Sequence, residues 1–209
     1  MKSERGFTLV ELVIGMVLLG IACAGSLSLL LSQKSAYRDP MVQQTSLQII
    51  NKIAGEIRIR SFDSKSDLGG GVFRCSEPVI DDFQLAECTT EAKYGIDAGE
   101  SASDIGTFDD IDDFVTAKLC ASIAGCQGEY APAAYFYSIF KDDSLFINLL
   151  DGYFVRVRVT PCRLSALPSG GDANITCSGA DDHSAKKIDI SILQRDDNVV
   201  DYSFLKANI

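Results

Sequence analysis

A single carboxylate stands inside the longest apolar run of the sequence. Residues 7–31, FTLVELVIGMVLLGIACAGSLSLLL, contain one charged side chain, that of Glu11. A carboxylate without a partner costs several kcal/mol in an apolar environment, so a charge inside a membrane segment indicates a functional site. As a helix the run is about 37 Å long, which exceeds the bilayer core of about 30 Å. The sequence therefore predicts a membrane helix whose acid needs a cationic partner.

A short polar segment precedes this run. Residues 1–6 read MKSERG and carry Lys2 and Arg5, whereas the first basic residue after the run is Lys34. This distribution favours a cytoplasmic N-terminus and places the rest of the chain outside the cytoplasm. An ordinary secretory signal has an apolar region of about 7 to 15 residues. The run here is longer and charged, so an ordinary signal peptide is disfavoured.

The heptapeptide RGFTLVE, residues 5–11, resembles the cleavage and methylation motif of type IV prepilins and type II secretion pseudopilins. The resemblance implies that a membrane prepilin peptidase cuts after Gly6 and methylates the new N-terminal amine of Phe7. It also implies that Glu11 pairs with this amine in its own or a neighbouring subunit. A buried carboxylate that finds an ammonium selects one axial register between subunits. The implied partners are other pilins or minor pilins, the peptidase and the inner membrane.

Hydrophobic spacing predicts the elements that hold this segment. We expect one long bent helix from residue 7 to about residue 60, with Pro40 kinking or interrupting it. Its first half (7–31) would cross the membrane, and its amphipathic second half (32–60) would lie against a globular head (61–209). A membrane helix followed by an independent linker helix is the alternative. The second half carries an apolar stripe at helical spacing: Leu47, Ile50, Ile53 or Ala54, and Ile57.

Alternating apolar residues predict a small antiparallel sheet in the head. Valines at 155, 157 and 159 share one face of an expected strand at 152–161, and isoleucines at 188, 190 and 192 share one face at 187–194. A final strand is expected at 199–205. A preceding strand at 146–150 would join 152–161 through a hairpin turn at Asp151-Gly152. The expected fold class is α+β, a long N-terminal helix packed on a small antiparallel sheet with disulfides.

Seven cysteines are many for 209 residues. Cys23 lies in the apolar run, and an even set beyond a membrane segment predicts an oxidising compartment and disulfides. Six cysteines allow 15 connectivities, of which pairs closing the short loops 120–126 and 162–177 are the first guesses. Zinc is disfavoured because no CxxC pair occurs and His183 is the only histidine. The disulfide candidates are Cys75, Cys88, Cys120, Cys126, Cys162 and Cys177.

The chain is acidic, with a formal net charge of -10. Nucleic acid is therefore not an expected partner, because phosphate binding needs a basic surface. No cofactor is expected. An aspartate cluster could bind calcium, but it lacks the EF-hand pattern. The favoured interpretation buries Phe108, Ile111 and Phe114 and leaves the aspartates in water. The members of the cluster are Asp109, Asp110, Asp112 and Asp113.

Three short stretches extend the resemblance beyond the N-terminus. RSFD at 60–63, TFDDIDDF at 107–114 and LDGYFV at 150–155 follow in an order similar to MshD-like minor pilins of the mannose-sensitive haemagglutinin pilus. The resemblance implies a minor pilin that enters or primes a type IV pilus and supports adhesion. It would be located first in the inner membrane and then in the pilus at the cell surface. A type II secretion pseudopilin and a tip adhesin are the alternatives. No catalytic motif occurs, so an enzyme is not expected.

Overall fold

The computed structural model describes these parts of the chain: 9–66, 74–76, 87–140, 148, 150–165, 174–177, 184–194 and 197–208. Within them, the side chains of 24–42, Tyr137 and Ser165 are not described. The chain divides into two compact units, Met1–Gln44 and Thr45–Ile209. Helix α1, Leu9–Ile59, contributes to both.

The first unit consists of the N-terminal part of α1. Its large apolar side chains are exposed, from Leu9 at 81% to Ile21 at 66%. The helix continues through Pro40, so the interruption that this proline suggested is not present. A proline removes one backbone donor, and a helix this long keeps its hydrogen bonds on both sides.

The structure describes only part of the expected membrane span, residues 7–31. Residues 7 and 8 and the side chains of 24–31 lie outside the described part of the chain. Among the residues that are described, no helix has both the length and the apolar character needed to cross a membrane.

The second unit begins with the C-terminal part of α1, which buries one stripe. Buried residues recur here at the spacing of neighbouring turns, so one side of the helix faces the core. Leu47 is 50% exposed, so the prediction that it belongs to the stripe was wrong. Ser46, one turn before Ile50, is buried there instead. The buried positions are Ser46, Ile49, Ile50, Ile53, Ala54 and Ile57.

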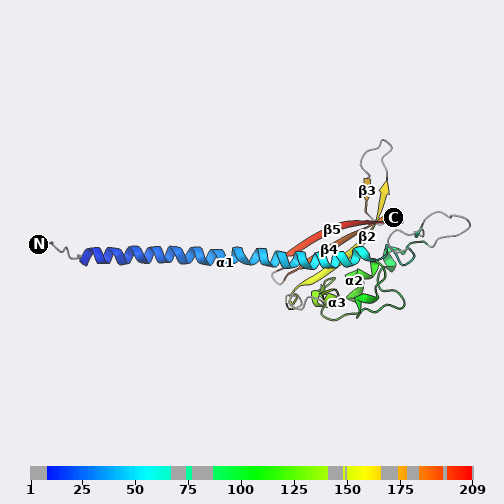
Figure 1. Cartoon of the computed structure of the whole chain (residues 1–209), viewed down its shortest axis with the longest axis horizontal. Helices are drawn as coiled ribbons and strands as arrows, with labels where there is room; N and C mark the ends of the chain where they lie inside the picture. The colour runs from blue at the N-terminus through cyan, green and yellow to red at the C-terminus, as the bar shows by residue number, and fades with distance from the viewer. Residues whose placement is uncertain are drawn as a thin grey trace, which may run out of the picture. The chain divides into compact units, whose positions relative to one another are not determined.

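The described residues form an antiparallel sheet in the order β1-β2-β4-β5, with β3 paired to β2. Figure 1 shows β2, β4 and β5 alongside the cyan, C-terminal part of α1. Both helix and sheet are present, so the fold class is α+β. The strands are β1 (Ala131–Pro132), β2 (Phe154–Ser165), β3 (Asn174–Thr176), β4 (Ala185–Leu193) and β5 (Val199–Ala207).

The register of β2 against β4 builds the core. Val157 lies opposite Ile190, and Val159 lies opposite Ile188. These side chains are at most 4% exposed and belong to the same buried cluster as Ile53 of α1. The predicted alternation of both strands is therefore confirmed. One face of the sheet packs on the helix, because side chains two apart in a strand point the same way.

The beginning of β2 has a different neighbour from the one expected. Phe154 pairs with Pro132 of β1 on one side and with Leu193 of β4 on the other. Both edges of β2 are taken there, so the expected hairpin with 146–150 cannot form at this position. Residues 146, 147 and 149 lie outside the described residues. The turn at Asp151-Gly152 is present, and Gly152 has a φ of 82°, which glycine adopts without strain.

Short helical turns lie along the chain between α1 and β2. One of these turns lies within the acidic stretch 75–106, and a second begins there, at Ile105. In the aromatic stretch 135–140, Phe136 and Phe140 are fully buried, so they belong to the core. The turns are η1 (Glu91–Lys93), η2 (Ile105–Thr107), η3 (Asp112–Phe114), α2 (Thr116–Leu119), η4 (Ala133–Phe136) and α3 (Tyr137–Phe140).

Strand β5 closes the C-terminal end of α1. Lys206 donates to the carbonyl oxygens of Ile57 at 3.4 Å and Arg58 at 3.2 Å, and also to that of Arg60. The last carbonyl groups of a helix have no partner within it, and a cation there also interacts favourably with the helix dipole. Burial, with a smaller effect from Lys186, lowers the pKa of Lys206 to about 8. A side chain distant in sequence thus completes the helix end.

Candidate functional site

The N-terminal motif is only partly described. Gly6 and Phe7 lie outside the described residues, so cleavage and methylation there stay predictions. Glu11 lies in the first turn of α1 and is exposed. A carboxylate is favoured at this end of a helix because the unpaired N–H groups there carry partial positive charge. Its pairing with an N-terminal amine stays a prediction.

The aspartate cluster of the head is buried rather than solvated. Asp110, Asp112 and Asp113 are 1%, 2% and 1% exposed, and Asp109 alone is exposed. The favoured interpretation, with all four carboxylates in water, was therefore wrong for three of them. Its other half is confirmed, because the intervening apolar residues Phe108, Ile111 and Phe114 are in the core.

Backbone N–H groups explain how these carboxylates are accommodated. Asp110 accepts from Ser64 N at 2.6 Å and from Asp112 N at 2.7 Å. Asp113 Oδ2 accepts from the backbone N–H groups of Asp109 at 3.2 Å and Asp110 at 3.1 Å. Each carboxylate satisfies donors that the tight turn would otherwise leave unpaired. Asp110 and Asp113 thus cap the backbone of their own turn, and Asp110 also binds the segment after the helix.

Burial also changes the acidity of the cluster. It raises the pKa of Asp110 to about 8, with the charge of Asp112 as the next cause, and that of Asp113 to about 9, with the charge of Asp110 next. The pKa of Asp112 is raised by burial too, although the charge of Lys186 opposes the change. Asp110 and Asp113 therefore retain a proton at neutral pH, which relieves repulsion within the cluster.

A buried lysine lies beside this cluster, and it was not among the residues singled out from the sequence. Lys186 of β4 is 0% exposed. Its Nζ donates to Phe62 O at 2.7 Å and to Asp112 Oδ1 at 2.8 Å, and lies 3.3 Å from Asp63 Oδ2. A sequence signal existed, because residue 186 has the same parity as the core-facing isoleucines at 188, 190 and 192.

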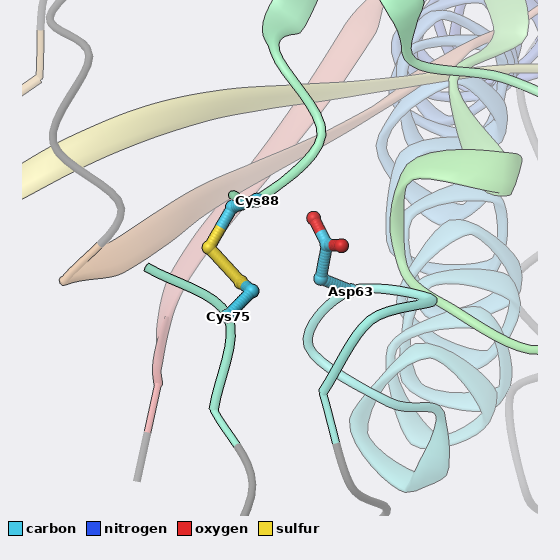
Figure 2. Close-up of side chains that lie close together, drawn as sticks. All are labelled: Asp63, Cys75 and Cys88. Carbon is cyan, nitrogen blue, oxygen red and sulfur yellow. A yellow bond between two sulfur atoms is a disulfide. The ribbon is translucent and has the colours of Figure 1, made fainter. Parts of the chain in front are cut away.

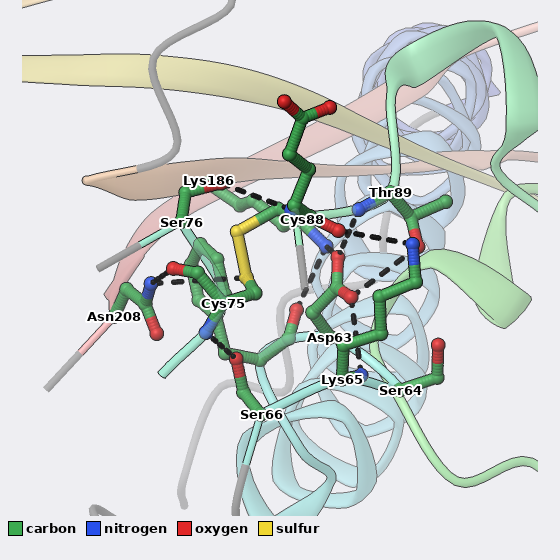
Figure 3. Close-up of a disulfide and its surroundings, with 12 residues drawn as sticks. Asp63, Ser64, Lys65, Ser66, Cys75, Ser76, Cys88, Thr89, Lys186 and Asn208 are labelled. Carbon is green, nitrogen blue, oxygen red and sulfur yellow. Dashed lines mark hydrogen bonds and ion pairs between the residues drawn. A yellow bond between two sulfur atoms is a disulfide. The ribbon is translucent and has the colours of Figure 1, made fainter. Parts of the chain in front are cut away.

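Asp63 joins the lysine to the segment that follows the helix. It accepts from Thr89 N at 2.8 Å, from Thr89 Oγ1 at 3.3 Å and from Lys65 N at 3.2 Å; Figure 3 shows these contacts with Lys186. Nearby, Ser61 N donates to Asp109 O at 3.0 Å. The stretches 60–63 and 107–114, separate landmarks in the sequence, therefore meet at one buried centre.

The six cysteines beyond the helix pair as 75–88, 120–126 and 162–177, and Cys23 is free and exposed. Figure 2 shows the carboxylate of Asp63 beside the first of these disulfides, with the possible ligand atoms of the three residues within 4.8 Å of one another. A disulfide has no thiolate to offer a metal, so this group does not fit a metal site while the bond is intact.

A second group of carboxylates is relevant to the predicted calcium site. Oxygens of Glu100, Asp109 and Asp113 lie within 4.8 Å of one another. Both Glu100 oxygens accept backbone N–H groups, from Asp109 at 2.9 Å and Asp97 at 2.8 Å. The four aspartates named from the sequence do not converge, because Asp110 and Asp112 bind Ser64 and Lys186. Calcium needs six to eight oxygens, and calcium binding here stays a prediction.

Comparison with known proteins identifies the N-terminal segment. A family model of the prokaryotic N-terminal methylation motif matches residues 1–27. No curated protein and no solved structure matches the chain. The matched motif supports a type IV pilin-like prepilin or pseudopilin. In general it implies processing by a prepilin peptidase and association with other pilin subunits, and it suggests a structural subunit rather than an enzyme.

Proposed function

We propose that this chain is a minor pilin, a structural subunit that enters or primes a type IV pilus, of the MshD-like type. The observation that carries the proposal is the methylation motif at residues 1–27, directly continued by a helix with exposed apolar side chains. Cleavage after Gly6 and methylation of Phe7 produce the mature N-terminus. The domains are the leader (1–6), the assembly half of the helix (7–31), its amphipathic half (32–60) and the head (61–209).

The exposed helix supports association through its N-terminal half. The side chains of Leu9, Met16 and Leu19 are 81%, 67% and 66% exposed. Apolar surface of this extent is stabilised when it leaves water, in a membrane or against neighbouring helices. The subunit therefore resides in the inner membrane before assembly and in the pilus at the cell surface afterwards.

Glu11 sets the axial register between subunits in this proposal. The amine of Phe7 exists only after cleavage, and it is the cation that the carboxylate needs in an apolar surrounding. An unpaired buried charge costs about 3 to 5 kcal/mol, so a subunit docked one turn away would be rejected. Processing and docking are then consecutive steps of one mechanism.

The head supports a minor role over that of the bulk subunit. It carries the disulfides, and the two MshD-like stretches 60–63 and 107–114 come together in it at one buried centre. Both features suit a specialised subunit. A type II secretion pseudopilin is the second candidate, because it shares every N-terminal feature. An adhesive tip role rests on the resemblance alone.

Mass spectrometry of the mature protein tests the proposal. We expect an N-terminus at methylated Phe7, and any other N-terminus would refute prepilin processing. An amount equal to the main subunit in sheared pili would refute the minor role. Recovery from a secretion pseudopilus instead of pili would favour the second candidate.

The variant Glu11→Ala tests the register. We expect normal cleavage but at least about tenfold less protein in sheared pili, because the amine of Phe7 loses its partner. Glu91→Gln, an exposed acid of the head, is the control and should assemble normally. Wild-type incorporation of Glu11→Ala would contradict the role of Glu11.

A further inference from the structure

An amine and a carboxyl group are held in contact in the interior of the head. Lys186 Nζ lies 2.8 Å from Asp112 Oδ1, with the two side chains 0% and 3% exposed. The rings of Phe62 and Tyr94 lie 4.8 and 4.9 Å from the same nitrogen. Two opposite charges in such a place are costly to desolvate. The pair is thus both well positioned and kept from water.

Asp63 and Asp112 differ in what else they bind. Asp63 already accepts from Thr89 and Lys65 and is 3.3 Å from the amine. Asp112 is nearer to the amine, and its side chain also hydrogen-bonds with that of Asp110. Asp63 therefore serves as a hydrogen-bonded counter-charge, and Asp112 is the carboxyl exposed to attack.

Asp110 supplies an acid at the same place. Burial first, and the charge of Asp112 second, raise the pKa of Asp110 to about 8, so it is protonated at neutral pH. A protonated carboxyl beside a second carboxyl can donate to an oxygen that leaves. Its own position is fixed by Ser64 N at 2.6 Å.

We infer that Lys186 and Asp112 condense to an intramolecular isopeptide bond. The ammonium of Lys186 first gives one proton to the Asp112 carboxylate, which leaves a neutral amine beside a neutral carboxyl. The Nζ lone pair then attacks Cγ of Asp112 and forms the C–N bond. Asp110 protonates the departing hydroxyl and takes a second proton from Nζ. One C–O bond breaks and one water leaves, with Asp110 restored.

The surroundings favour the product. One buried ammonium and one buried carboxylate become a neutral amide, which removes the cost of two desolvated charges, and no oxidant is needed. Tyr94 is 3% exposed, and its hydroxyl has no hydrogen-bond partner in the described part of the chain. Burial first, and the charge of Asp112 second, raise the pKa of Tyr94, so its phenol stays a neutral donor, and its ring lies 4.9 Å from the attacking nitrogen.

Peptide mass spectrometry of the full-length protein from cells, after reduction, tests the inference. We expect a branched peptide that joins Lys186 to Asp112 and is lighter than its two parts by one water. Recovery of both peptides only in linear form would overturn the inference. A succinimide at Asp151-Gly152 also loses water, but hydroxylamine cleaves it and leaves the isopeptide intact.

Single substitutions identify the two residues that the isopeptide bond joins. Asp112→Asn should lose ammonia in place of water, whereas a link still formed with loss of water, at Asp63, would overturn the assignment to Asp112. Lys186→Arg should contain no link, and the control Lys187→Arg should be linked as the wild type is.

Asp110→Asn, if its thermal midpoint shows a folded head, should link at least tenfold more slowly. Wild-type linking in Asp110→Asn would overturn the acid role of Asp110.

Discussion

Asp113 shows how the head tolerates acidic residues in its interior. It is 1% exposed, and its pKa is raised to about 9 by burial, by Asp110 and by Glu100. A carboxyl with a raised folded-state pKa binds its proton more tightly in the folded state than in the unfolded state. Its contribution to stability is therefore full below pH of about 4 and is lost as the pH rises towards about 9. The raised pKa of Asp110 makes the stability of the head fall with rising pH in the same way.

We predict that Asp113→Asn stabilises the head at alkaline pH. Asparagine keeps an oxygen to accept from the N–H groups of Asp109 and Asp110 but never ionises. The free energy of unfolding should rise by about 1 to 3 kcal/mol at pH 8 and change little at pH 4. Urea denaturation of the detergent-solubilised protein at both values measures this. The exposed neighbour gives the control Asp109→Asn, and an equal gain at both values would contradict the prediction.

At the scale of elements, the second part of α1 is joined to the sheet by one apolar stripe. Ile53 is 0% exposed and belongs to the cluster that contains Val157 and Ile190, whereas Leu47 is 50% exposed. The two side chains have similar size and lie on the same helix. They therefore separate the effect of burial from that of helix propensity.

We predict that Ile53→Ala destabilises the head by about 2 to 5 kcal/mol, because the lost side chain leaves a cavity in a packed core. Leu47→Ala should change stability by less than about 0.5 kcal/mol, since it removes an exposed group. Thermal unfolding followed by circular dichroism compares the two. Equal losses would show that the stripe is assigned incorrectly.

Periodicity predicted those elements whose side chains alternate between core and solvent. Val157 and Ile190 are examples, because apolar and polar residues alternate along a strand that has one buried and one exposed face. Lys186 obeys the same parity but is charged, so only its partners, 74 and 123 residues away, explain its burial. Strand β1, two residues long, is too short to show a period. Long-range pairing and burial of charge are set by tertiary structure, which a local pattern does not contain.

At the scale of the whole molecule, covalent closure compensates for irregular backbone. The Cys75–Cys88 bond has a sequence separation of 13 residues. Asn208 Nδ2 donates to Cys75 O at 3.2 Å, and Thr89, next to Cys88, donates to Asp63. The bond therefore holds two segments on which the buried lysine centre depends.

We predict that the double change Cys75→Ser and Cys88→Ser lowers the free energy of unfolding by about 3 kcal/mol, the chain-entropy value for a loop of this length. Cys23→Ser, at the free and exposed cysteine, is the control and should leave the head unchanged. Denaturation of the three proteins under non-reducing conditions measures the difference. An undiminished stability of the double variant would contradict the prediction.

The contact of Lys206 with the end of α1 has a consequence for the timing of synthesis. The carbonyl of Arg60 receives its donor from a residue 146 positions later, so the helix end stays incomplete while the intervening chain is being made. Contacts of such long range form slowly. The head therefore cannot close while the chain is being synthesised, and its earlier segments stay accessible to chaperones until β5 has been made.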